Sequence, residues 1–112
     1  MRPYTLTAGI GFASAFAWLV AACAPMEPRA PVVDAAMVDQ AGGASLATLS
    51  QGRRIFLTLC PKYHRCDKAT SHSTIEWHGI VDRMSERAGW TREEQSALLA
   101  YLAAANAAAR SR

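Results

Sequence analysis

The chain has 112 residues, of which 51% are hydrophobic, and a formal net charge of +3. At face value this length and composition indicate one small soluble domain, but much of the apolar content lies at the start of the chain. Its positive charge is too small and too scattered along the sequence to indicate a nucleic-acid partner.

The first segment has the features of an export signal. Arg2 supplies a positive charge, and residues 4–22 contain no charged residue. The segment ends in small residues before Cys23, with the aliphatic Val20 three positions earlier. This ending is typical of a processing site and resembles a lipobox, the bacterial lipoprotein motif. We therefore predict that residues 1–22 are a lipoprotein signal peptide and that Cys23 is the lipid-modified first residue of the mature protein.

Lipidation at Cys23 predicts attachment to a membrane. Each buried methylene contributes roughly 0.8 kcal/mol, so several acyl chains hold a protein on a bilayer essentially permanently. Plain cleavage after an Ala and an uncleaved membrane anchor are the alternatives, and all three place the rest of the chain outside the cytoplasm. Ala24 stands where an Asp would suggest retention at the inner membrane, which favours the outer membrane. Removing residues 1–22 removes Arg2 alone and leaves a mature net charge of +2.

Residues 23–45 are expected to form a lipid-anchored linker. Prolines gather early in this segment, glycines follow at Gly42 and Gly43, and no helical or strand period is sustained. Such a composition predicts a tether that is semi-rigid at its proline end and flexible at its glycine end.

Residues 46–112 are expected to form a helical domain. The first predicted helix spans residues 46–59, because apolar or small residues recur on one face at helical spacing. These residues are Leu49, Gly52, Ile55, Phe56 and Leu59.

Two further helices are announced by capping boxes, in which Ser or Thr is followed three residues later by Glu. Ser73 and Glu76 begin the second helix, and Gly89 is expected to end it. Thr91 and Glu94 begin the third helix. The apolar stripe of the second helix consists of Trp77, Ile80, Val81, Met84 and Ala88, and that of the third begins with Leu98, Leu99, Tyr101 and Leu102.

The fold class predicted is therefore all-α, with no strand pattern. A domain of this size seldom stabilises itself by core burial alone. A cofactor, a metal, a disulfide or a partner is expected to supplement the core.

The segment between the first two helices carries the residues best suited to that role. It reads Cys-Pro-Lys-Tyr-His-Arg-Cys from residue 60 to residue 66. In c-type haem attachment, C-x-x-C-H, two thiols add to the haem vinyl groups and the adjacent imidazole binds the iron. Cys60 and His64 have this register, whereas Tyr63 stands where the second cysteine belongs.

With its surroundings, this segment resembles a small c-type cytochrome domain over residues 46–105, especially the haem-binding type in the alpha subunit of quinohaemoprotein amine dehydrogenase. Three stretches carry the resemblance: residues 52–56 leading into Cys60, residues 76–84 with Glu-Trp and Val-Asp-Arg-Met, and residues 89–102 with Gly-Trp-Thr, Glu-Gln and Leu-Ala-Tyr-Leu. The resemblance implies a three-helix cytochrome c-like fold, haem binding and electron transfer. It also implies a close crossing of the first and third helices through Gly52, Phe56 and Tyr101.

The altered motif is compatible with three outcomes. In the first, haem c is held by one thioether from Cys60 and by His64 on the iron. The distal ligand is then Met84, His72 or His78. Met84 continues the apolar stripe of its helix, where a Met is commonly core filler. His78 points off that stripe and His72 sits in the loop, so each is expected to be a solvated side chain, and Met84 is the ligand we predict together with His64.

In the second outcome haem is lost, and Cys60 pairs with Cys66 in an oxidising compartment. The scaffold then acts as a binding or structural module. In the third, Cys60, His64 and Cys66, with His72, hold a metal such as zinc, although the spacing fits no standard site.

The sequence offers no nucleophile–base pair, paired carboxylates or phosphate-binding glycine loop, so we do not predict an enzyme. A haem-loaded protein would exchange electrons with a redox partner protein. We favour haem binding narrowly over the haemless module.

Overall fold

The computed structural model describes residues 29–58 and 67–112. Four helices lie in these residues: α1 (Ala35–Asp39), α2 (Leu46–Thr58), α4 (Thr74–Ala88) and α5 (Arg92–Arg110). The described residues contain no strand, which confirms the predicted all-α class.

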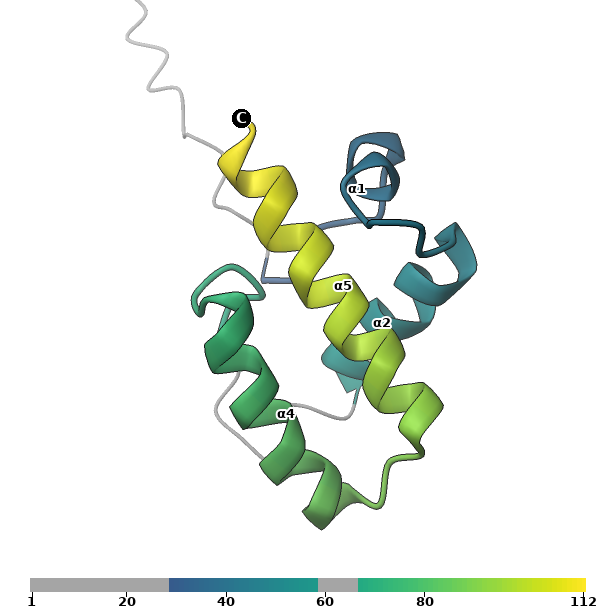
Figure 1. Ribbon diagram of the computed structural model, residues 1–112, viewed down its shortest axis with the longest axis vertical. Helices are drawn as coiled ribbons and strands as arrows, with labels where there is room; N and C mark the ends of the chain where they lie inside the picture. Colours follow the sequence, from purple (N-terminus) through teal and green to yellow (C-terminus); the bar gives the residue numbers. More distant parts are fainter. Residues whose placement is uncertain (1–28, 59–66) are drawn as a thin grey trace, which may run out of the picture.

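Helix α5 is the centre of the fold (Figure 1). Its 19 residues contact α1, α2 and α4, and most of its contacts are with α2. The apolar residues of α5 are buried on more than one side, as expected for a helix that three neighbours cover. The domain is therefore organised around its C-terminal helix.

The two capping boxes set the starts of α4 and α5, as predicted. The Ser73 hydroxyl accepts from the Glu76 amide at 3.2 Å, while the Glu76 carboxylate accepts from the Ser73 amide at 2.7 Å. Thr91 and Glu94 form the same reciprocal pair at the start of α5. Gly89 ends α4 with φ of 66°, a left-handed conformation that glycine adopts without steric cost.

Helices α2 and α5 cross in close contact at Gly52. A Cβ atom placed on Gly52 would overlap the Ala97 carbonyl oxygen and would lie 2.6 Å from Tyr101 Cβ. Phe56, one turn further along α2, places its ring 6.3 Å from the Tyr101 ring. The crossing expected of Gly52, Phe56 and Tyr101 is therefore present.

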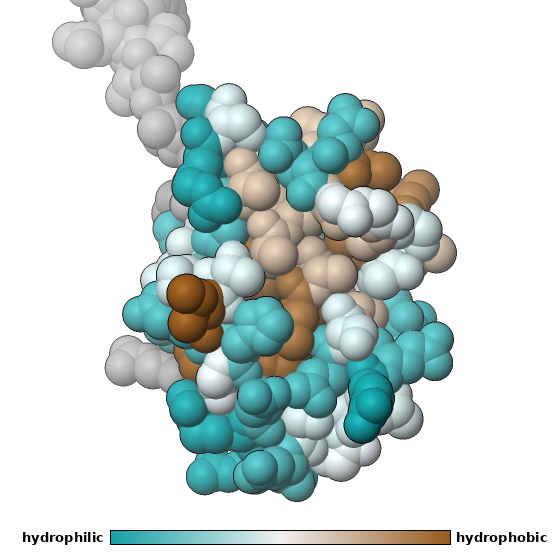
Figure 2. Space-filling view, viewed as in Figure 1, coloured by the Kyte–Doolittle hydropathy of each residue, from teal (hydrophilic) through white to brown (hydrophobic). Residues whose placement is uncertain are grey.

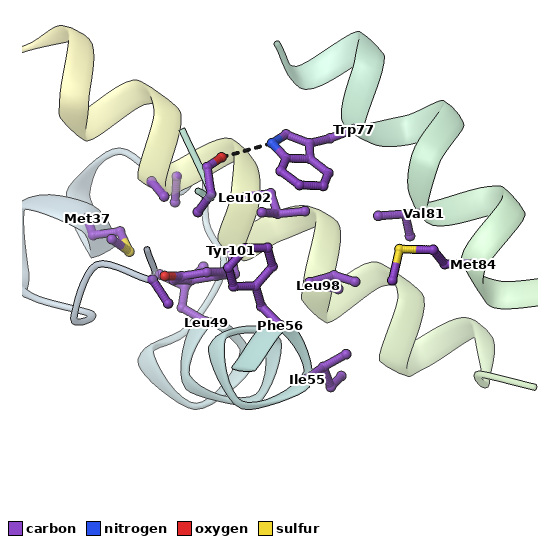
Figure 3. Packing of buried hydrophobic residues seen from close by; sticks show 14 of the residues in the cluster. Met37, Leu49, Ile55, Phe56, Trp77, Val81, Met84, Leu98, Tyr101 and Leu102 are labelled. Atoms are coloured by element: carbon purple, nitrogen blue, oxygen red, sulfur yellow. Dashed lines mark hydrogen bonds between the residues drawn. The ribbon is translucent and has the colours of Figure 1, made fainter. Parts of the chain in front are cut away.

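The hydrophobic core collects side chains from every described helix. Figure 3 shows those of α4 reaching toward α5 and those of α2 approaching α5 from another side. The large side chains in this core include Met37, Leu49, Phe56, Trp77, Met84, Leu98, Tyr101 and Leu102.

Residues 29–45 differ from the flexible linker that the sequence predicted. Helix α1 lies inside this range, Asp34 caps it by accepting from the Met37 amide at 2.8 Å, and the Met37 side chain is fully buried. Ala30 is buried as well. The linker prediction is wrong for residues 29–45, because a five-residue helix is too short to show a period. The rest of the predicted linker, residues 23–28, lies outside the described residues.

An N-terminal strap, residues 29–33, is tied across the α2–α5 crossing by long-range hydrogen bonds. Arg53 Nε donates to the carbonyls of Ala30 and Pro31, at 3.3 and 3.2 Å. The Tyr101 hydroxyl donates to the Pro31 carbonyl at 2.8 Å. The strap thereby covers the crossing, and its polar backbone groups find partners there.

Within residues 29–58 and 67–112, no helix is long and apolar enough to cross a membrane. The predicted signal peptide 1–22 and Cys23 lie outside the described residues.

Candidate functional site

The residues predicted to attach haem lie outside the described residues. Cys60, Tyr63, His64 and Cys66 all fall within residues 59–66. The predicted distal ligands, Met84, His72 and His78, are described. The structure therefore describes the chain on either side of the attachment segment.

The chain enters this segment from the α2–α5 crossing. Helix α2 is described to Thr58, two residues after Phe56. Phe56 is buried, and its ring meets the Trp77 ring edge-on at 5.9 Å between centroids. The crossing and this aromatic contact fix the position of α2 just before Cys60.

The chain leaves the segment at a second fixed point, Ala69. The buried Ala69 carbonyl accepts from Trp77 Nε1 at 2.8 Å and from Asn106 Nδ2 at 3.0 Å. Its amide donates to the Arg29 carbonyl at 2.8 Å. Ala69 is thus joined to α4, to α5 and to the N-terminal strap. Both flanks of the attachment segment are consequently held by the core.

Met84 lies in the buried interior. Its side chain is 2% exposed and shares a face of α4 with Trp77 and Val81. In Figure 3 these three side chains point toward Leu98 and Leu102 of α5. Met84 therefore places a neutral thioether in an apolar wall, and the apolar stripe predicted for α4 is buried at these three positions.

The two histidines occupy different surroundings. His72 Nε2 lies 2.9 Å from Asp67 Oδ2, and its ring meets the Trp77 ring edge-on at 4.9 Å. The His72 side chain is 28% exposed, and His78 is on the exposed side of α4. Of the three predicted distal ligands, Met84 is the one inside the core.

The interior contains few polar groups. Asn106 is the buried polar residue of the described chain, and its Nδ2 donates to both Ala69 and Leu102 carbonyls. Burial raises the pKa of Tyr101 to about 12, an effect that the nearby Arg53 guanidinium partly opposes. Tyr101 is therefore neutral at physiological pH, as suits a hydroxyl that donates to a backbone carbonyl.

The pKa of Glu76 is shifted downward, in contrast to that of Tyr101. Hydrogen bonds from the Ser73 amide and hydroxyl lower the pKa of the Glu76 carboxyl, and the nearby His72 contributes in the same direction. The carboxylate is fully exposed, so its role is that of the predicted cap at the start of α4.

An open hollow lies on the outer side of α4. It is broad and shallow rather than enclosed, and Ile75 at its rim is 84% exposed. A hollow of this shape does not bury an apolar ligand from water. Its lining consists of His72, Ile75, Glu76, Gly79, Ile80 and Arg83.

Among residues 29–58 and 67–112, no group of three or more His, Cys, Asp or Glu side chains could hold a metal ion. The ligands proposed for a zinc site, Cys60, His64 and Cys66, lie outside this range. One buried polar atom in the described part, Trp90 Nε1, has no hydrogen-bond partner. In the sequence, Trp90 contributes to the resemblance through its Gly-Trp-Thr stretch, but the pattern predicts no site role for it.

Comparison with protein-family models, with curated proteins and with solved structures finds no significant match to this chain.

Proposed function

We propose that this protein is a membrane-anchored, c-type cytochrome-like electron carrier of the bacterial cell envelope. Cys60 would attach haem through one thioether, and His64 and Met84 would hold its iron. The observation that carries the proposal is the position of Met84, a neutral thioether in the apolar wall beside Trp77. That tryptophan ties down the chain directly after the attachment segment.

The described interior offers side chains of the kind that pack against a haem group. An apolar macrocycle packs against apolar side chains, and the ones we propose for this role are Phe56, Trp77, Val81 and Met84. No charged side chain is buried in the described residues. A thioether is a known haem ligand in cytochromes c, where it raises the reduction potential.

The chain's own contribution would be to hold the attachment segment in place from both sides. The α2–α5 crossing positions its N-terminal flank, and the hydrogen bonds to Ala69 position its C-terminal flank. Fixed flanks limit rearrangement around the site when charge changes, which favours electron transfer. The bound haem supplies the chemistry itself, a one-electron change between ferrous and ferric iron.

Location would follow from lipidation at Cys23. Acyl chains would hold the domain at a membrane surface outside the cytoplasm, with the outer membrane preferred. A redox partner protein in the same compartment would exchange electrons with it.

A second candidate is a haemless binding module closed by a Cys60–Cys66 disulfide. The observation that favours it is the packing of the described core, in which Met84 lies against other apolar side chains like an ordinary core methionine.

The two candidates differ in colour and in thiol content. The full-length protein would be expressed together with c-type haem maturation machinery, and its reduced-minus-oxidised absorption spectrum recorded. We expect cytochrome bands and a haem-stained species on a denaturing gel. A colourless protein without free thiols would refute the haem proposal and support the disulfide-closed module.

Single substitutions then test the residue assignments. Cys60→Ala should abolish the covalent haem stain, whereas Cys66→Ala, the matched control, should leave it. Met84→Leu conserves apolar volume and should change the spectrum and lower the reduction potential. His72→Gln should change neither. A spectrum altered by His72→Gln and unaffected by Met84→Leu would overturn the assignment of Met84.

A further inference from the structure

One end of the domain carries a cluster of exposed basic side chains close to where the chain leads toward Cys23. We call it the basic end and define it as Arg29, Lys68, Arg110 and Arg112, all of which are exposed. Figure 2 shows hydrophilic side chains gathered at the top of the view, where α5 ends in Figure 1.

Hydrogen bonds at Ala69 bring three parts of the chain together at this end. The Ala69 amide donates to the Arg29 carbonyl at 2.8 Å, which places Lys68 beside Arg29. The Ala69 carbonyl accepts from Asn106, and Arg110 follows four residues later on the same face of α5.

Two acidic residues, Asp34 and Asp67, border the basic end, so its four cations less these two carboxylates leave a net charge of +2. Arg112 lies 3.6 Å from the Asp34 carboxylate, but the Arg112 side chain is still 67% exposed. Asp67 pairs with His72, on the side of α4. An exposed ion pair of this length contributes little energy, so it does not prevent Arg112 from meeting another anion.

The strap also shortens the tether to the proposed anchor. Because Ala30 is buried and Pro31 is bound by Arg53 and Tyr101, only six residue steps separate Cys23 from the start of the strap at Arg29. Six residue steps span at most about 22 Å, so an anchor at Cys23 would keep the basic end near the bilayer. Attraction between a cation and an anionic surface falls off over roughly 8 Å at physiological salt. The short connection allows the basic end to come within that distance of the bilayer.

We propose that the basic end rests on anionic phospholipid headgroups and sets the orientation of the domain on the membrane. This inference depends on the lipidation of Cys23 that forms part of the proposed function. Each cation near an anionic bilayer surface strengthens binding roughly fivefold. The α4–α5 turn, at the opposite end of α5 and about 27 Å away, then points away from the membrane, toward soluble partners.

The test uses the lipidated mature protein in vesicles of phosphatidylcholine alone or of phosphatidylcholine mixed with phosphatidylglycerol. Arginine modification by phenylglyoxal is followed at each site by mass spectrometry. Arg110 should react several-fold more slowly in the anionic vesicles, and high salt should remove this protection. Arg92, exposed at the other end of the same helix, should react equally in both.

A matched pair of variants localises the effect. Arg110→Gln combined with Arg112→Gln should reduce the lipid-dependent protection of Arg29, whereas Arg92→Gln should leave it unchanged. Equal reaction rates of Arg110 in both vesicle types would overturn the inference. Protection of Arg110 in native envelope membranes but not in lipid vesicles would also overturn it, and would assign the surface to a protein partner. The mass of the peptide carrying Cys23 separates failure of the lipid anchor from failure of the membrane orientation. An unacylated peptide would overturn both. An acylated peptide, with equal Arg110 reaction rates in the two vesicle types, would overturn the orientation alone.

Discussion

Replacing Gly52 by alanine should destabilise the domain strongly, because α2 and α5 leave no room for a Cβ atom. The added carbon would overlap the Ala97 carbonyl oxygen and would lie 2.8 Å from the Ala97 carbonyl carbon. The obstructing atoms belong mainly to the backbone of α5, so they cannot rotate away as a flexible side chain would. The helices would have to separate along the whole crossing.

The magnitude follows from two opposing effects. Overpacking a well-packed core costs about 1–3 kcal/mol, and a backbone obstruction belongs at the upper end. Alanine is favoured over glycine inside a helix by about 1 kcal/mol, which offsets part of this cost. The net loss of about 2 kcal/mol corresponds to a decrease in Tm of roughly 8–16 °C for a domain of this size.

Gly79→Ala provides the matched control. Gly79 also lies inside a helix, but the nearest atom to a Cβ placed on it is a terminal nitrogen of Arg83 at 3.5 Å, an ordinary contact. This variant should gain the helical preference of alanine, about 1 kcal/mol, and raise Tm. Thermal unfolding of both variants would be followed by far-ultraviolet circular dichroism. A Gly52→Ala protein that unfolds at or above the wild-type temperature would refute the close crossing.

Three further outcomes are expected. Met37→Ala should lower stability by about 2 kcal/mol or more, because it empties a fully buried site between α1 and the core; a change under about 0.5 kcal/mol in urea unfolding would return residues 29–45 to the status of a linker. The raised pKa of Tyr101, about 12 against an ordinary 10.0, means that the folded state favours the neutral phenol. The stability gained from the neutral Tyr101 phenol is complete below pH 10 and is lost as pH rises toward 12. Tyr101→Phe should therefore flatten the alkaline decline in Tm. An unchanged decline would contradict the burial of this hydroxyl. The lowered pKa of Glu76 gives the opposite pH dependence. The stability gained from the ionised Glu76 carboxylate is present above its ordinary pKa of 4.5 and is lost as pH falls through the lower pKa of the folded state. Glu76→Gln should therefore weaken the acid dependence of unfolding, and a curve parallel to wild type would argue against the ionised cap.

Local patterns in the sequence were enough to predict most of the helical framework. Ser73 with Glu76 and Thr91 with Glu94 mark helix starts through hydrogen bonds that span only three residues. Gly89 marks the end of α4 for an equally local reason, its left-handed backbone. Such signals depend on neighbours in the chain, and sequence reasoning can therefore find them.

The candidate site was predictable only in part. The helical period placed Met84 on the stripe with Trp77 and Val81, and the structure buries all three. The sequence also placed His78 off this stripe and His72 in the loop, and both are more exposed than Met84 in the structure. Their exposure, which separates them from Met84, depends on how α4 rotates against α5. The attachment residues Cys60 and His64 stay predictions.

The chain's own pattern thus established an all-α domain and its capped helices, because propensity, period and capping act over a few residues. Tertiary structure alone decided that residues 29–45 belong to the packed domain. The partners that hold the strap, Arg53 and Tyr101, lie 22 to 70 residues away from Ala30 and Pro31. No local pattern indicates a contact of that separation, since these carbonyls meet their donors only when α2 and α5 have packed together.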